Sequence, residues 1–451
     1  MIESQCAAIV LAAGMGTRMK STLPKVMNRI GGLPMLNHVL KSLETLQLKQ
    51  CCVVIGPDMD NVRDAAAPHP VAIQQERLGT ADAVKAARQV VGEKPAGTVL
   101  VVFGDSPFLL TGTMADMVEA REAGAGVVVL GFRAADPTGY GRLVMAKDNS
   151  LAEIVEHRDA TSEQRRIDLC NSGVMAIDGD ILFGLLDAVG NDNAKGEYYL
   201  TDIVAIARAA GRKCTVIEAD ESELMGINSK ADLAIAEQRF QSDARRAALE
   251  GGVTLHDPET VWFSHDTQIG LDVEIEPHVV FRPGVRIGDG VTIKAFSHLE
   301  GATVDAGATI GPFARLRPGA VIGSGARVGN FVEIKNASLA EGAKANHLSY
   351  IGDATVGPAA NIGAGTITCN YDGYLKSKTE IGAGAFIGSN TALVAPVVIG
   401  DGAIIGAGST ITENVSKDAI ASARGDQMEK PGAAARFRDR RAKQKADLKK
   451  S

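Results

Sequence analysis

Aromatic residues are scarce in this sequence, and the scarcity argues against one class of function. The 451 residues include one Trp, six Tyr and twelve Phe, or 4% aromatic. Proteins that bind single-stranded nucleic acid stack its bases on aromatic side chains. Lys and Arg number 47 against 54 Asp and Glu, and the net charge of −7 has the wrong sign for a general nucleic-acid binder. We therefore expect no nucleic-acid partner.

Cysteine is scarce as well, and long apolar runs are absent. The six cysteines form no Cys-x-x-Cys pair and show no spacing typical of a disulfide-rich protein. No apolar stretch is long enough to span a bilayer, and the N-terminal MIESQCAAIVLAAG has no basic region before its apolar residues. We expect a reduced, cytoplasmic protein with no membrane insertion.

Lys and Arg outnumber Asp and Glu at one end of the chain. Residues 424–451 hold ten Lys or Arg against four Asp or Glu, a net charge of +6. We interpret this end as a solvated basic tail rather than a binding site.

At 45% apolar and 22% charged, a chain of this length is expected to fold into two or three domains.

The first half of the chain alternates short apolar runs with helical stretches. The predicted strands are 7–11, 52–55, 99–103 and 127–130, and the predicted helices include 80–91 and 113–122. This alternation predicts an α/β, Rossmann-like domain over residues 1–229, with a mostly parallel sheet covered by helices. Residues 230–250 contain no Gly or Pro and are followed by Gly251 and Gly252. We predict a linker helix over 230–252, capped by Asn228 or Ser229.

After Gly252 the apolar residues recur every six positions. The series runs from Ile269 to Ile293, from Val304 to Ile334, from Tyr350 to Thr368 and from Ile381 to Ile411. Twenty of its 21 positions are apolar, and Gly follows eleven of them, whereas an ordinary strand would alternate with period two. A six-residue period predicts short strands that turn at regular corners and stack as a parallel β-helix over residues 253–451.

The period is broken at two places of interest. Ile334 and Tyr350 are 16 residues apart, and Thr368 and Ile381 are 13 apart. Neither interval is a multiple of six, so we predict loops extruded from the β-helix. The first would carry His347, and the second contains CNYDGYLKSKTE. Loops that leave a repeat structure commonly carry its binding function.

The first predicted strand leads into the glycine-rich segment LAAGMGTRMKSTLPK. This segment is neither a P-loop nor a complete dinucleotide-binding fingerprint, because Gly-Lys-Ser/Thr is absent and Met19 stands where the third Gly would be. By itself, such a segment is as consistent with a plain turn as with a phosphate site. Backbone N–H groups of residues 14–17 would surround phosphate oxygens, while Arg18 and Lys25 would neutralise their charge.

The segments LAAGMGTRM and LPKVM resemble the signature of sugar-phosphate nucleotidyltransferases. Further matching motifs follow in order: QQERLGTADA, FGDSP, DPTGYGR, IVEHRDA, NSGV, GEYYLTD and GIN. The six-residue repeat resembles that of left-handed β-helix acyltransferases. Together the two halves resemble the bifunctional N-acetylglucosamine-1-phosphate uridyltransferase/glucosamine-1-phosphate acetyltransferase family. That resemblance implies acetyl transfer from acetyl-CoA to glucosamine 1-phosphate. Uridyl transfer from UTP to the N-acetylglucosamine 1-phosphate so formed would follow, with release of pyrophosphate.

The resemblance also implies roles for residues of the first half. Asp105 and Asn228 would hold Mg²⁺, and Gly141, Glu156 and Asn171 would hold the sugar. The residues implied for UTP are Leu11, Ala12, Ala13, Gly14, Arg18, Lys25, Gln74, Gly79, Thr80 and Phe103, with Asn228 also near the substrate. The family commonly has Tyr where this chain has Phe103, so a hydroxyl is missing there. Without the motif, Asp105 would be read as a turn residue.

In the second half, the resemblance makes His347 the proton acceptor for acetyl transfer. An imidazole near neutral pH suits the deprotonation of an amine. The residues implied for the amino-sugar phosphate are Arg317, Lys335, Tyr350, Asn361 and Lys376. Those implied for acetyl-CoA are Ala364, Asn370, Tyr371, Ser389, Ala407 and Arg424. The resemblance also implies a homotrimer.

Three other interpretations remain open. In the first, the chain is a sugar-1-phosphate nucleotidyltransferase whose β-helix is structural or regulatory, but His347 and the motifs NFVEIKN and CNYDGY argue against this. In the second, the chain is a non-catalytic scaffold, and the intact GMGTR, Lys25 and FGD argue against that. A β-helix carbonic anhydrase needs three His ligands on neighbouring coils, and the histidines do not share one phase of the repeat.

Overall fold

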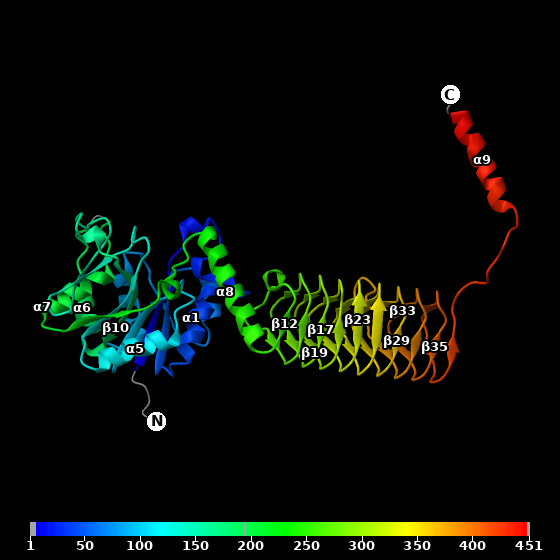
Figure 1. Ribbon diagram of the computed structural model, residues 1–451, viewed down its shortest axis with the longest axis horizontal. Helices are drawn as coiled ribbons and strands as arrows, with labels where there is room; N and C mark the ends of the chain where they lie inside the picture. The colour runs from blue at the N-terminus through cyan, green and yellow to red at the C-terminus, as the bar shows by residue number, and fades with distance from the viewer. Residues whose placement is uncertain (1–5, 194, 449–451) are drawn as a thin grey trace. The chain divides into compact units, whose positions relative to one another are not determined.

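The computed structural model describes residues 6–193 and 195–448, so the last three residues of the predicted basic tail lie outside the described part. The chain divides into two compact units, Met1–Ala244 and Arg245–Ser451. Each unit has its own architecture (Figure 1). Within the described residues, no helix has the length and apolar character needed to cross a membrane.

The first unit is built on a mostly parallel sheet, as predicted. Its strands follow the order β11-β7-β10-β6-β1-β4-β5, and β10 alone runs antiparallel to its neighbours in this path. A hairpin of β8 and β9 attaches to β10. The strands are β1 (Cys6–Leu11), β4 (Gln50–Ile55), β5 (Val71–Ile73), β6 (Thr98–Phe103), β7 (Val127–Arg133), β8 (Arg142–Met145), β9 (Leu151–Val155), β10 (Leu169–Asp178) and β11 (Cys214–Glu218). A separate hairpin pairs β2 (Arg29–Ile30) with β3 (Leu33–Pro34).

Helices cover both faces of this sheet. They are α1 (Met35–Glu44), α2 (Asp60–Ala66), α3 (Thr80–Ala86), α4 (Arg88–Val91), α5 (Thr111–Glu122), α6 (Gly179–Asp187) and α7 (Ile203–Ala209). The single helix predicted over 80–91 is therefore wrong in detail. The Ala87 N–H bonds to the Val84 carbonyl, which tightens the last turn of α3 and separates it from α4.

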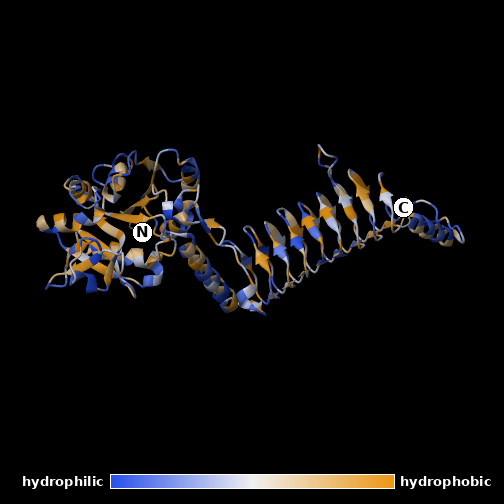
Figure 2. Ribbon diagram, turned by 90° about the horizontal axis from the view of Figure 1, so that it is seen from above, coloured by the Kyte–Doolittle hydropathy of each residue, from blue (hydrophilic) through white to orange (hydrophobic). Residues whose placement is uncertain are grey.

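Two apolar cores lie on the two faces of the sheet. Ala8 and Val10 of β1 belong to one core, and Ile9 and Leu11 belong to the other, because successive side chains of a strand point to opposite faces. Figure 2 shows the strands of this sheet largely in the colour of apolar residues. The result is the predicted Rossmann-like three-layer arrangement, with the ends of β1 and β6 paired side by side.

Helix α8 (Lys230–Glu250) begins at the predicted residue and ends two residues before the predicted end, because Gly251 and Gly252 follow it. Its cap is Ser229. The Asp232 N–H donates to Ser229 Oγ at 3.2 Å, and Asp232 Oδ2 accepts from the Ser229 N–H at 2.9 Å, which is a reciprocal capping pair. The side chain of Asn228 takes no part in this cap and points instead toward Lys25. The sequence alone left these two roles of Asn228 open.

The second unit is a β-helix of three parallel sheets, one per side of the coil. Ile275 pairs with Ile293, eighteen residues later, which is three sides of six residues. The first sheet holds β12 (Thr254–Leu255), β14 (Glu274–Ile275), β17 (Thr292–Ile293), β20 (Thr309–Ile310), β23 (Arg327–Asn330), β26 (Lys344–His347), β29 (Asn361–Ile362), β32 (Phe386–Ile387), β35 (Ile404–Ile405) and β37 (Ile420–Ala421). Figure 1 shows its labelled strands stacked coil upon coil.

The other two sheets complete each coil. The second sheet holds β15 (Val280–Phe281), β18 (His298–Leu299), β21 (Arg315–Leu316), β24 (Glu333–Lys335), β27 (Tyr350–Gly352), β30 (Ile367–Cys369), β33 (Ala392–Val394) and β36 (Thr410–Ile411). The third holds β13 (Gln268–Ile269), β16 (Arg286–Ile287), β19 (Ala302–Val304), β22 (Ala320–Ile322), β25 (Ser338–Leu339), β28 (Ala354–Val356), β31 (Thr379–Ile381) and β34 (Val397–Ile399). We call the turn from the first to the second sheet the first corner, and the turn from the second to the third the second corner.

One of the two predicted loops is wrong. Residues 335–349 stay in the coil, because β25 and β26 pair normally with their neighbours. Leu339 and Ile351 face inward, and Tyr350 does not. Ile334 pairs with Ile351, so this coil has seventeen residues and takes one five-residue step at a corner. His347 therefore ends strand β26 and does not sit in a loop.

The other predicted loop is confirmed. Val356 pairs with Ile381, which leaves 25 residues between neighbouring coils instead of eighteen. Residues 370–378 leave the coil at the second corner, between β30 and β31. Tyr374 and Leu375 are 92% and 71% exposed, so the tip of the loop has little packing of its own.

Candidate active sites

A cavity of about 400 Å³ opens at the carboxyl end of the parallel strands in the first unit. Leu11 and Phe103, which are paired ends of β1 and β6, lie on its wall. The predicted residues that line it are Leu11, Ala12, Ala13, Gly14, Lys25, Gln74, Gly79, Thr80, Phe103, Asp105 and Asn228. Ligands of open α/β sheets bind at this edge. The fold thus gathers residues spread over more than 200 positions of sequence.

A cluster of charged and polar groups occupies one end of this cavity. Lys25 Nζ contacts Asp105 Oδ2 in an ion pair and donates to Asn228 Oδ1 at 2.7 Å. Arg18 Nη2 donates to the same Asn228 oxygen at 2.8 Å. Both side chains of the Lys25–Asp105 pair are less than a fifth exposed. Arg18, which is not among the lining residues, is therefore held at the cavity through Asn228.

Asp105 and Asn228 present oxygen atoms to the same nitrogen of Lys25, so these two oxygens lie close together. One carboxylate and one amide oxygen form the kind of incomplete, all-oxygen donor set that Mg²⁺ accepts, since this ion keeps several waters. The donor chemistry fits the predicted ion. Among the described residues, no group of three or more His, Cys, Asp or Glu gathers into a larger metal site.

The position of Lys25 depends on Gly16. The backbone of Gly16 is left-handed, with φ of +66°, and a Cβ there would lie 2.6 Å from Lys25 Cβ. Glycine is thus required both for the turn and for the close approach of the lysine. This packing is consistent with a phosphate-binding role of GMGTR, because the backbone of the loop lies directly against the side chain of Lys25.

Four lining residues had no predicted role. They are Val26, Arg77, Ala83 and Glu197. Arg77 Nε donates to the Ala13 carbonyl at 2.8 Å and so supports the strand end that forms the cavity wall. Arg77 lies within the matched motif QQERLGT, but no spacing in the sequence connects it to Ala13. The one feature of the sequence that could have pointed to Arg77 is its charge within a motif that binds substrate in the family.

The predicted sugar residues form a second group beside the cavity. The Asn171 N–H donates to the Gly141 carbonyl at 2.9 Å, and a Cβ on Gly141 would lie 3.6 Å from Glu156 Oε1. Asn171 Oδ1 also accepts from the Gly173 N–H at 2.9 Å, and Gly173 packs against the ring of Phe103. This group is therefore continuous with the cavity wall. Burial raises the pKa of Glu156, although the nearby Lys195 opposes this effect.

In the β-helix, three cations meet at the second corner. Lys335 lies beside Lys376 of the extruded loop, and this neighbour lowers the pKa of Lys335 through a hydrogen bond and like-charge repulsion, with a smaller effect from Arg317. Arg317 Nη1 is held by Glu333 Oε1 at 2.9 Å. Such a cluster of two lysines and one arginine suits a phosphate.

His347 lies at the first corner of the same coil region. Its Nδ1 is 2.6 Å from Asn330 Oδ1. A carboxamide oxygen accepts and does not donate, so Nδ1 carries the hydrogen and Nε2 is left to accept a proton. Tyr350 begins the strand that connects this corner with the cation cluster. Asn361 stands opposite Lys344 in the first sheet, in the strand β29 that leads into the first corner.

The predicted acetyl-CoA residues follow the first corner from coil to coil. The carbonyl of Ala364 accepts from the Asn390 N–H, and that of Ser389 accepts from the Gly408 N–H. Ala407 accepts from Arg424 Nη1 at 2.7 Å. The single hydroxyl hydrogen of Ser349 is shared between the carbonyls of His347, at 2.8 Å, and Gly363, at 3.3 Å, which ties His347 to this column. Asn370 and Tyr371 lie elsewhere, at the base of the extruded loop on the second corner.

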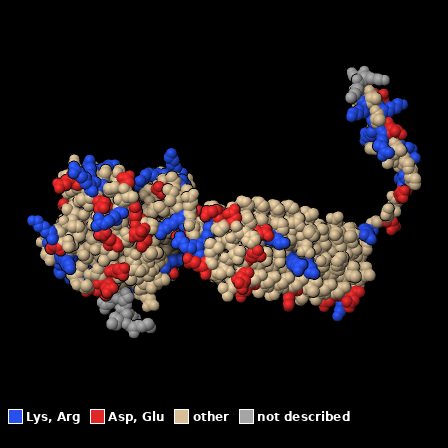
Figure 3. Space-filling view, in the orientation of Figure 1, with Lys and Arg blue, Asp and Glu red and all other residues tan. Residues whose placement is uncertain are grey.

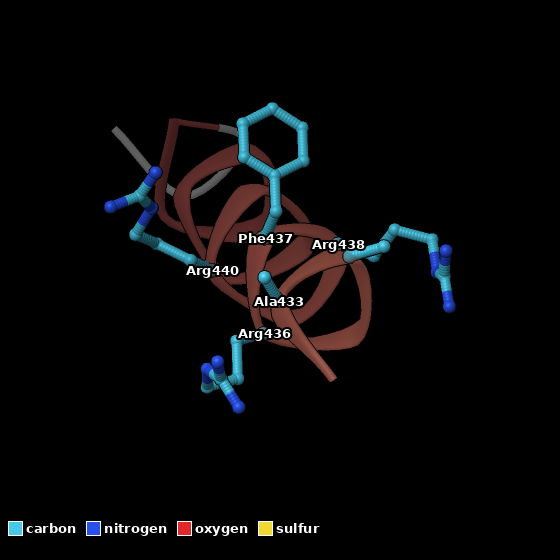
Figure 4. A pocket seen from close by; sticks show the side chains of 6 residues that line it. Ala433, Arg436, Phe437, Arg438 and Arg440 are labelled. Atoms are coloured by element: carbon cyan, nitrogen blue, oxygen red, sulfur yellow. The ribbon is translucent and has the colours of Figure 1, made fainter. Parts of the chain in front are cut away.

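The described part of the basic tail contains helix α9 (Ala433–Leu448), whose side chains are exposed or nearly so. Figure 3 shows Lys and Arg densely placed on it, whereas much of the visible β-helix surface is uncharged. A hollow beside this helix is lined by Arg436, Phe437, Arg438 and Arg440. Figure 4 shows these side chains pointing away from one another. They do not converge on a site.

A nucleotide-sized cavity at the edge of a Rossmann-like sheet, joined in one chain to a parallel β-helix, defines a two-domain transferase. Sequence profiles agree with both halves. The MobA-like NTP transferase domain matches residues 8–168, and the bacterial transferase hexapeptide repeat matches residues 266–301, 301–336 and 378–413. The predicted left-handed β-helix is thereby confirmed.

The particular family follows from close relatives. A bifunctional protein GlmU of Paramagnetospirillum magneticum is 57% identical over 448 residues, which cover 99% of each chain. Those of Rhodospirillum rubrum and Sphingopyxis alaskensis are 60% and 53% identical, over 96% and 99% of this chain. The chain belongs to the bifunctional GlmU family. Its predicted nature, an acetyltransferase and uridyltransferase in one chain, is confirmed, and a purely structural β-helix is excluded.

Proposed function

We propose that the first unit joins UTP to N-acetylglucosamine 1-phosphate at the cavity beside Lys25. The sugar phosphate attacks the α-phosphorus of UTP, and pyrophosphate leaves. Such a reaction needs positioned cations more than a nucleophilic side chain. The observation that carries this proposal is the convergence of Arg18, Lys25, Asp105 and Asn228 at one end of a cavity of nucleotide size.

Within this proposal each part of the cavity has a task. Lys25 and Arg18 hold phosphate oxygens, and the strand end at Ala12 and Ala13, together with Gln74, reads the uracil ring. Gln74 is 5% exposed, and its amide nitrogen donates to Gly79 O at 3.1 Å and to Asp82 Oδ2 at 2.8 Å, so its orientation is fixed. Mg²⁺ at Asp105 and Asn228 would neutralise charge that develops on the phosphates.

We propose that the second unit acetylates glucosamine 1-phosphate with acetyl-CoA. Asn330 orients His347, whose Nε2 takes a proton from the sugar ammonium and frees the amine for attack. Arg317, Lys335 and Lys376 hold the sugar phosphate, with Tyr350 and Asn361 at the sugar. The pantetheine arm lies along Ala364, Ser389 and Ala407, and Arg424 meets a CoA phosphate. Asn370 and Tyr371 at the base of the extruded loop complete the contacts.

Two assays test the two proposals separately. Pyrophosphate should appear from UTP with N-acetylglucosamine 1-phosphate, and free thiol should appear from acetyl-CoA with glucosamine 1-phosphate. Exchanging the two sugars should remove most of both signals. Pyrophosphate release that does not distinguish the two sugars would contradict the proposed order, in which acetylation comes first.

Gly79→Ala is expected to lower uridyl transfer by about 10²-fold, the cost of a misplacement near 1 Å. The φ of Gly79 is +129°, and a Cβ there would lie 2.4 Å from the carbonyl oxygen of Tyr198, so the cavity wall must shift. Gly92→Ala is the matched control, because Gly92 also has a positive φ but has open space around it. Equal losses of pyrophosphate release in the two variants would show that backbone strain, and not a shift of the cavity wall, lowers the rate.

The predicted division into residues 1–229, a linker helix at 230–252 and residues 253–451 also makes a testable claim. A fragment ending at Glu250 should retain uridyl transfer within about threefold of the intact chain, since the cavity lies within the first compact unit. Circular dichroism would establish that the fragment is folded. A folded fragment without pyrophosphate release would contradict this division.

We further propose a cytoplasmic homotrimer. The six cysteines are free thiols, which suits a reducing compartment. The rings of Phe296, Phe313 and Phe331 stack on one another along the first corner, with centroids 4.9 and 5.1 Å apart, and each ring residue is at least 45% exposed. Exposed apolar ladders of this kind are commonly covered by another chain. Light scattering at micromolar concentration distinguishes a trimer from a monomer.

A further inference from the structure

Asp353 is a buried carboxylate at the second corner of the β-helix. It is 7% exposed, and its φ of +47° places it in the left-handed region, which Asp and Asn adopt more readily than most residues other than Gly. An acidic residue held in such a conformation and removed from water needs strong partners. No motif in the sequence draws attention to it.

The partners of Asp353 come from three separate segments: residues 335–336, Asn370 and Thr379. Its carboxylate accepts from Asn336 Nδ2 at 2.6 Å and from Asn370 Nδ2. Its N–H donates to the Lys335 carbonyl at 3.0 Å, and its own carbonyl accepts from the Thr379 N–H at 3.2 Å. Asp353 therefore joins the strand that ends in Lys335 to both ends of the extruded loop.

The loop depends on this attachment. Asn370 opens it and Thr379 follows it, and the Ser377 N–H closes the loop base on the Asn370 carbonyl at 2.9 Å. The exposed tip contributes little packing. The position of Lys376, near the end of the loop, is therefore set from the base.

The negative charge of Asp353 also stabilises the loop beside Lys335. Burial disfavours its ionised form, but the hydrogen bonds from Asn336 and Asn370 and the charges of Lys376 and Lys335 outweigh that effect and lower its pKa. The carboxylate thus stays negative beside cations that otherwise repel one another. It offsets the repulsion between Lys335 and Lys376.

We propose that Asp353 is a positioning residue of the acetyltransferase site, which fixes the 370–378 loop and holds Lys335 and Lys376 together as a clamp for the sugar phosphate. The inference rests on the acetyl transfer proposed above. Asp353 does not touch the reacting atoms. It acts through the two lysines and through Asn370.

Other aspartates of the β-helix show what a purely structural role looks like. Asp289 Oδ1 accepts from the Leu271 N–H and Asp401 Oδ1 from the Ala383 N–H, each at 2.8 Å. Both carboxylates thus cap a turn of the preceding coil. Asp353 instead binds two side-chain amides, one of which begins the loop. Asp401→Asn is therefore the matched control for Asp353→Asn.

The test compares steady-state acetyl transfer by the two variants and the intact chain. Asparagine at 353 keeps the size but presents an NH₂ group to one of its two amide donors, so one partner loses its acceptor. We expect Asp353→Asn to raise KM for glucosamine 1-phosphate by about tenfold or more, with kcat changed less than about threefold. Chymotrypsin cleavage at Tyr371 and Tyr374 should become faster in this variant only.

A second variant protects the test against misfolding. Asn336→Gly removes one hydrogen-bond donor to Asp353, and its φ of +44° suits glycine. It should raise the same KM in the same direction by a smaller factor. Uridyl transfer in both variants should stay unchanged and reports that the chain is folded.

The outcomes separate the inference from the function on which it rests. An unchanged KM and loop cleavage rate in Asp353→Asn would overturn the inference, and so would equal losses in Asp401→Asn. A fall in kcat with no rise in KM would also contradict it. Failure of the intact chain to release thiol would instead refute the proposed acetyl transfer.

Discussion

Replacing Asp105 by alanine is expected to stop uridyl transfer while acetyl transfer continues at nearly its normal rate. The carboxylate is the only charged protein ligand assigned to Mg²⁺, and it is also the ion-pair partner of Lys25. Its loss removes several kcal/mol of charge stabilisation in the transition state, equivalent to about 10³-fold or more in rate. Pyrophosphate release at a series of Mg²⁺ concentrations measures the effect.

The control is Asp60→Ala, since Asp60 is a surface residue with an exposed side chain paired with Arg63. Asp105→Asn separates charge from shape, because it keeps an oxygen near Lys25 without the negative charge. Near-normal pyrophosphate release by Asp105→Ala at limiting Mg²⁺ would show that Asp105 is not the metal ligand. Thiol release by every variant reports on the other unit.

Replacing His347 by alanine is expected to remove acetyl transfer and leave uridyl transfer intact. Loss of a positioned base costs roughly 10²–10⁴ in rate. The amine substrate is mostly protonated at neutral pH, and free amine becomes abundant as the pH rises. The acetyl-transfer rate of the intact chain divided by that of the variant should therefore decrease as the pH rises. The measurement is the pH–rate profile of both, followed by thiol release.

His298→Ala provides the matched control, because His298 lies in the second sheet of the β-helix and has no role in the proposed site. An equal loss by His347→Ala at every pH would assign a positional role to the imidazole. No loss would mean that another group is the base. Asn330→Ala should give a smaller loss, since it removes only the group that orients Nδ1.

The first unit could be predicted closely because its motifs sit at strand ends. The run before Gly14 predicted β1, and parallel strands bring their carboxyl ends to one edge, which is where Leu11 and Phe103 lie side by side. Arg77 escaped prediction because its contact with Ala13 spans 64 residues and follows only from the completed sheet. Asn228 could not be assigned between a helix cap and the cavity until Ser229 was seen to make the cap.

The sequence predicted the β-helix fold correctly. It did not predict which residues near His347 face the interior of the coil. A strict six-residue period treats a five-residue side as a break and predicts that Tyr350 faces inward, whereas Ile351 does. The apolar series Leu339, Ala345 and Ile351 was the missed signal. Asp353 could not be found from the sequence at all, because its role arises from segments brought together by neighbouring coils.

The central claim is that one chain carries two active sites that work in sequence. Its most direct test supplies glucosamine 1-phosphate, acetyl-CoA and UTP together and follows free thiol and pyrophosphate separately with time. The account predicts that thiol appears first, that pyrophosphate follows after a lag and never exceeds it, and that omitting acetyl-CoA removes both. Pyrophosphate released without acetyl-CoA at the full rate would contradict the claim.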